Sequence, residues 1–92
     1  MTINNFWEYP PLPYLEHVLK NCPKAGLTYL NLWQKRDKHM RYSVPSGQVP
    51  YHTLQSTAQF RHNLLLLVRE GLISMHEDGK SIRVELVDWE DE

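Results

Sequence analysis

Cysteine, glycine and long apolar segments are all scarce in this chain. It has one cysteine and four glycines, and its longest run of apolar side chains extends only from Leu64 to Val68. A single cysteine excludes an internal disulfide, and so short an apolar run is unable to span a bilayer. The segment from Met1 to Pro13 also lacks the basic stretch and apolar stretch of a secretory signal. We therefore expect a cytoplasmic protein that has no membrane partner.

Patterns that carry enzyme chemistry are missing as well. No two of the five histidines have the spacing of a helical metal motif, and the single cysteine adds little to a metal site. There is no glycine-rich phosphate loop, and no spacing selects a serine, a histidine and an acid as a catalytic set. We expect no catalytic residues, no metal and no other cofactor, and so not an enzyme.

Positive charge is concentrated in the middle of the chain. All ten lysines and arginines lie between Lys20 and Arg83 together with four acidic residues, so this stretch carries a net charge of +6. Residues 88–92, by contrast, hold four carboxylates. A basic region is compatible with a polyanionic partner, and equally with an ordinary solvated surface. The whole-chain net charge of −1 thus hides an uneven distribution.

The length of 92 residues fits one small domain. Residues 1–13 are rich in proline and aromatic side chains, which predicts an extended arm because proline disfavours helix at its own position and at the preceding one. We expect Phe6 and Trp7 of this arm to pack onto the domain or to contact a partner. Residues 14–87 are expected to form the domain, and residues 88–92 an acidic tail.

Helical spacing of apolar residues dominates the first half of the domain. It predicts a first helix from Pro13 to Asn21 and a second from about Lys24 to His39. In the second helix Leu27, Leu30 and Trp33 line one side while Tyr29 and Leu32 fall elsewhere, so we expect this helix to be buried on much of its circumference.

Local signals predict the remaining elements. These are a short edge strand over residues 41–45, a brief helix over 50–55, a longer helix ending near Glu70, and strands over 72–76 and 81–87. Ser56 has the position of an N-cap for the longer helix, and Gly71 that of a left-handed C-cap. Asp78-Gly79 is typical of a tight hairpin turn. The alternating residues Ile82, Val84 and Leu86 are expected on one buried face of the last strand.

The end of the longer helix has a more specific pattern. Phe60, Leu64, Leu67 and Gly71 follow at steps of four, three and four, and two apolar residues come directly after. This segment resembles the end of the recognition helix and the start of the wing in winged helix-turn-helix proteins. The resemblance covers roughly residues 24–87 and implies an α+β fold of three to four helices with a C-terminal β-hairpin wing. The chain departs from that family in the short helix before the recognition helix and in the few charges on the recognition helix's outer side.

The resemblance implies binding to double-stranded DNA, with the recognition helix in the major groove. The expected DNA contacts are Ser56, Thr57, Gln59, Arg61 and His62 on the helix, and Lys80 and Arg83 on the wing. Gln59 is expected to pair with adenine and Arg61 with guanine or phosphate. The wing cations are expected to hold the DNA backbone. Such a protein is a transcriptional regulator or a replication accessory.

Two leucines support an alternative hypothesis. Leu65 and Leu66 lie on opposite flanks of the helical stripe that starts at Phe60, so one core is unable to bury both. An exposed apolar patch of this kind normally has a cover. We expect Leu65 and Leu66, with Phe6 and Trp7 of the arm, to form a homodimer or partner interface. The alternative is thus a winged-helix protein-interaction module that does not bind DNA.

Overall fold

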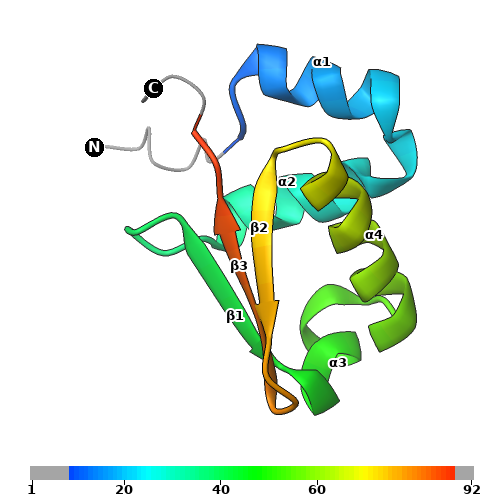
Figure 1. Cartoon of the computed structure of the whole chain (residues 1–92), viewed down its shortest axis with the longest axis vertical. Coiled ribbons are helices and arrows are strands. Elements are labelled where there is room, and N and C mark those ends of the chain that lie inside the picture. The colour runs from blue at the N-terminus through cyan, green and yellow to red at the C-terminus, as the bar shows by residue number, and fades with distance from the viewer. Residues whose placement is uncertain (1–8, 89–92) are drawn as a thin grey trace.

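The computed structural model describes residues 9–88, which form four α-helices, two short 3-10 helices and three strands (Figure 1). In chain order they are α1 (Leu12–Asn21), η2 (Pro23–Ala25), α2 (Gly26–Lys35), β1 (Arg41–Pro45), η3 (Ser46–Gln48), α3 (Val49–Thr53), α4 (Thr57–Arg69), β2 (Ile73–Glu77) and β3 (Ser81–Leu86). Phe6 and Trp7 of the expected arm, and residues 89–92 of the expected tail, lie outside the described residues.

The three strands form one antiparallel sheet in the order β1-β3-β2. Val84 at the centre of β3 lies opposite Tyr42 of β1 and Met75 of β2. The helices cover one face of this sheet, and β1, which follows α2 and precedes α3 in the chain, is one of its edge strands (Figure 1). The fold is therefore α+β, with the helix order and terminal hairpin of a winged helix. The β2–β3 hairpin, residues 73–86, is the wing.

The core lies between α4 and the inner face of the sheet, as the sequence predicts. Phe60, Leu64 and Leu67 of α4 are buried, and so are the alternating residues of β3, namely Ile82, Val84 and Leu86. Ile73 at the start of β2 joins the same cluster. The apolar stripe of α4 has helical period and that of β3 a period of two, and both stripes belong to one buried cluster.

The predicted capping residues adopt the expected conformations. Ser56 Oγ accepts a hydrogen bond from the backbone N–H of Gln59 at 3.1 Å and so begins α4. Gly71 has φ = 77°, and Gly79 in the wing turn has φ = 90°. Both glycines take the left-handed conformation that a side chain disfavours. These three residues fix both ends of α4 and the turn of the wing.

The second helix differs from the prediction in its length and in the exposure of one apolar residue. It ends at Lys35, four residues earlier than expected, because Arg36 is extended and Asp37 starts a turn. The Asp37 carboxylate accepts hydrogen bonds from the N–H groups of His39 (2.8 Å) and Arg41 (3.0 Å), which leads the chain into β1. These two bonds also hold the pKa of Asp37 below its usual value.

The predicted burial of α2 is confirmed at most of its apolar positions and wrong at Leu27. Trp33 is buried as expected, but Leu27 is 76% exposed and Leu30 is only half-buried. Tyr29 and Leu32 also pack inward, in agreement with burial on much of the circumference. Since α2 continues directly from η2, the contacts of η2 with α1 and α4 set the rotation of the helix. Periodicity within α2 alone gives no information on that rotation.

Candidate functional site

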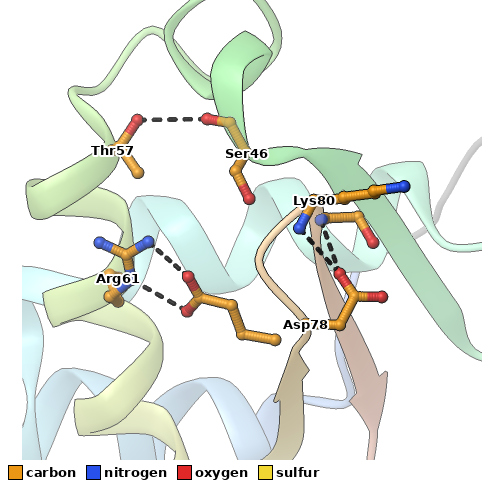
Figure 2. Close-up of polar contacts among 7 residues, drawn as sticks. Ser46, Thr57, Arg61, Asp78 and Lys80 are labelled. Atoms are coloured by element: carbon orange, nitrogen blue, oxygen red, sulfur yellow. Dashed lines mark hydrogen bonds and ion pairs between the residues drawn. The ribbon is translucent and has the colours of Figure 1, made fainter.

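The candidate site is the surface shared by the first half of α4 and the wing (Figure 2). The chain reaches α4 through a turn after α3, in which Leu54 adopts a left-handed conformation with φ = 60°. Thr53 Oγ1 donates to the carbonyl of Val49 at 2.8 Å and accepts from the N–H of Gln55 at 3.2 Å. The turn between α3 and α4 is therefore held by hydrogen bonds of the Thr53 side chain.

Three polar side chains fix the first half of α4 against α2. Asn63 Nδ2 donates to Gln55 Oε1 at 2.9 Å and to Thr28 Oγ1 at 3.2 Å, and Gln55 Nε2 donates to Thr28 Oγ1 at 3.0 Å. Thr28 and Asn63 are buried. Buried polar groups bonded in this way favour one arrangement of the helices. Sequence reasoning missed this network; the available signal was a polar residue at Asn63, three positions after Phe60 and beside the apolar stripe.

The side chain of Arg61 joins α4 to the wing. Its Nε donates to Glu77 Oε1 at 2.9 Å, and its second guanidinium nitrogen donates to the other oxygen of the same carboxylate (Figure 2). The hydrogen bonds raise the pKa of Arg61 and lower that of Glu77. Arg61, predicted to contact DNA, thus forms a bidentate ion pair with Glu77 of the same chain.

The wing turn is organised by Asp78. Its Oδ1 accepts from the N–H groups of Lys80 (2.9 Å) and Ser81 (3.0 Å), and these bonds lower the pKa of Asp78 (Figure 2). Its Oδ2 lies 3.2 Å from the guanidinium of Arg83. Arg83, predicted to contact the DNA backbone, is therefore already paired with Asp78. It also lies on the outer face of the sheet, because its neighbours Ile82 and Val84 face inward.

The remaining predicted contacts divide into structural and available side chains. Ser56 caps α4, and Thr57 Oγ1 donates to the carbonyl of Ser46 at 3.4 Å (Figure 2). Gln59, His62 and Lys80 are exposed, and their side chains have no partner among residues 9–88. The structure therefore leaves these three, on α4 and at the wing turn, available to a ligand.

The two leucines predicted at an interface have different surroundings. Leu65 is 55% exposed, whereas Leu66 is half-buried and packs against the core. Val68, one helical turn after Leu65, is also exposed. Sequence reasoning did not single out Val68, although its spacing of three from Leu65 was visible. The exposed apolar pair on α4 is Leu65 and Val68.

The outer face of the sheet carries its own mixed charges. Arg41 of β1 lies opposite Glu85 of β3, with Nε 3.6 Å from the carboxylate. His76 of β2 and Arg83 of β3 are likewise opposite each other. This face is turned away from α4. Within residues 9–88, no group of three or more histidine, cysteine or acidic side chains has a geometry that holds a metal ion.

The described helices include no candidate for a membrane span, since none is both long enough and apolar enough. Comparison of the chain with protein-family models, with curated proteins and with solved structures gives no significant match.

Proposed function

We propose that this is a DNA-binding protein that places α4 in the major groove and the wing turn beside the DNA backbone. The observation that carries the proposal is the exposed first half of α4, where Gln59 and His62 have no partner among the described residues, on a helix held rigidly by the Gln55–Thr28–Asn63 network. A helix held in place before binding loses little conformational freedom on contact with a ligand. The corresponding role is that of a cytoplasmic transcriptional regulator or replication accessory.

The charge of the described residues is compatible with this function but modest. Residues 9–88 carry ten lysines and arginines and seven acidic residues, a net charge of +3. Four of the arginines lie beside carboxylates: Arg41, Arg61, Arg69 and Arg83. Since phosphate contacts supply most of the affinity for DNA, we expect one copy to bind weakly. Two copies on one duplex double the contacts and read two half-sites.

Titration of a random-sequence duplex at two salt concentrations tests the proposal. We expect binding at low salt and a decrease in affinity as salt rises, because each phosphate contact releases counterions. Lys80→Ala should weaken binding to every sequence and make the dependence of log K on log salt shallower by about one unit. Lys20→Ala is the matched control, since Lys20 lies in the last turn of α1, and α1 is at the opposite end of the domain from the wing turn (Figure 1).

Two results would contradict the proposal. One is no binding to duplex at low salt with tens of micromolar protein, about the weak limit of non-specific contacts. The other is an equal effect of Lys80→Ala and Lys20→Ala on the salt dependence, because the wing turn would then have no special place in the complex.

A second candidate function is a protein-interaction module. The specific observation in its favour is the exposed pair Leu65 and Val68 on α4, together with arginines that are paired within the chain. A second copy of this chain is the occupant we propose for that apolar pair, since a dimer also serves the DNA-binding function. A chain that dimerises but fails to bind duplex at low salt fits this second function alone.

A further inference from the structure

Arginine is the side chain best suited to guanine, and α4 has only one in its first half. Among residues 57–68 the single cation is Arg61. A guanidinium reads guanine by two parallel hydrogen bonds, to O6 and N7. In this structure the Nε and a terminal nitrogen of Arg61 both donate to the carboxylate of Glu77. Two of the five N–H donors of the guanidinium are therefore bonded to Glu77, and the guanidinium is held against the wing.

Glu77 competes with guanine for this arginine. Guanine offers neutral acceptors, whereas the carboxylate of Glu77 also attracts the guanidinium by its charge. Glu77 also belongs to the same chain, and β2 packs against α4. No second molecule has to be ordered for the ion pair to form. The side chains of Arg61 and Glu77 are 39% and 28% exposed, so the pair lies at the surface.

The side chains that remain available on this part of α4 match an A·T pair. Ala58, Gln59 and His62 are exposed. The amide of Gln59 offers one donor and one acceptor, the pattern that pairs with N7 and N6 of adenine. The methyl group of Ala58 is the kind of apolar group that contacts the thymine methyl. Neither of these two side chains has a positive charge with which to favour guanine.

Resting on the proposed DNA-binding function, we infer that α4 reads A·T base pairs, and that Glu77 sets this preference by holding Arg61 away from guanine. Gln59 and Ala58 make the base contacts in this arrangement. Glu77 is a specificity-determining residue that acts through Arg61 and touches no base.

The first arm of the test compares two duplexes of equal length and identical ends, one with an A·T core and one with a G·C core. The wild type should bind the A·T core about tenfold more tightly, the discrimination expected from one good bidentate contact. Replacing adenine by 7-deazaadenine removes N7, and replacing thymine by uracil removes the methyl group. Both changes should reduce binding of the wild type, while bases read only through groove shape would leave it unchanged.

The second arm uses two variants with the same change in charge. Glu77→Ala releases Arg61 on the α4 side, whereas Glu85→Ala releases Arg41 on the outer face of the sheet. Both should gain some affinity for any DNA, because a negative charge is lost. Only Glu77→Ala should shift its preference toward the G·C core. Arg61→Gln should keep the A·T preference of the wild type. This variant provides an independent measurement if Glu77→Ala fails to fold.

The outcomes separate this inference from the function on which it rests. A wild type that binds both cores equally, or prefers G·C, overturns the inference while DNA binding stands. Loss of the A·T preference in Arg61→Gln overturns it as well, because Arg61 would then contact the DNA itself. If the wild type and Glu85→Ala bind neither core at low salt, the proposed function fails and the inference with it.

Discussion

At the scale of single residues, Leu64 and Leu65 are neighbours in the chain with opposite surroundings. Leu64 is fully buried and Leu65 is 55% exposed. Leu64→Ala should lower the free energy of unfolding by about 2–5 kcal/mol, since truncation leaves a cavity in the core. Leu65→Ala removes the same atoms from the surface and should change the free energy of unfolding by no more than about 0.5 kcal/mol. Urea denaturation of both variants measures the difference.

Equal effects of the two substitutions would contradict the register of α4. That register also places Arg61 on the side that faces Glu77, so the same pair of variants tests how the candidate site is built. The leucine comparison needs no ligand, which makes it independent of the proposed function.

The partner of Arg61 is a feature that the sequence alone does not predict. The residue was correctly located on the longer helix, but its partner Glu77 lies sixteen positions away on a strand. The pair depends on how α4 lies against β2, which is a property of the packed molecule. The interpretation of Arg61 as a base reader therefore rested on the helix alone. Gln59 and His62 are exposed as predicted, because their positions on α4 follow from its apolar stripe.

At the scale of elements, the end of α4 depends on one glycine. Gly71 has φ = 77°, and a methyl group added there meets no atom within 4 Å. The cost of Gly71→Ala is therefore backbone strain, and we expect a loss of about 1–2 kcal/mol in the free energy of unfolding. Gly47→Ala is the matched control, since Gly47 is equally uncrowded and has no positive φ. Thermal unfolding of the two variants measures the contrast, and similar destabilisation would contradict the left-handed cap.

Elements with local end signals were predictable, and the one without them was not. Ser56, Gly71 and the Asp78-Gly79 turn each act on backbone groups within a few residues, so α4 and the wing were placed correctly. The end of α2 is set by Asp37, whose carboxylate turns the chain toward β1. Asp37 lies within the helix that was expected to extend to His39. Nothing in the local pattern distinguishes an exposed aspartate on a helix from one that closes a turn.

At the scale of the whole molecule, the exposed pair Leu65 and Val68 predicts self-association. Sedimentation velocity at micromolar concentration should show a dimer of the wild type, and Leu65→Glu should shift it to monomer because a charge is buried at cost in an apolar contact. Leu27→Glu is the control, since Leu27 is also largely exposed but lies on α2. A wild type that stays monomeric at high concentration would leave the apolar pair without the proposed partner.

The sheet order has a consequence for how the protein is made. The middle strand, β3, is the last of the three to leave the ribosome, and β1 and β2 pair only with it. Until residues 81–86 have emerged, the sheet is unable to form, and the core lacks Ile82, Val84 and Leu86. A product cut short before Ser81 therefore exposes its interior and becomes a substrate for cellular proteases. Synthesis of this domain yields a folded molecule only when translation has passed its final strand.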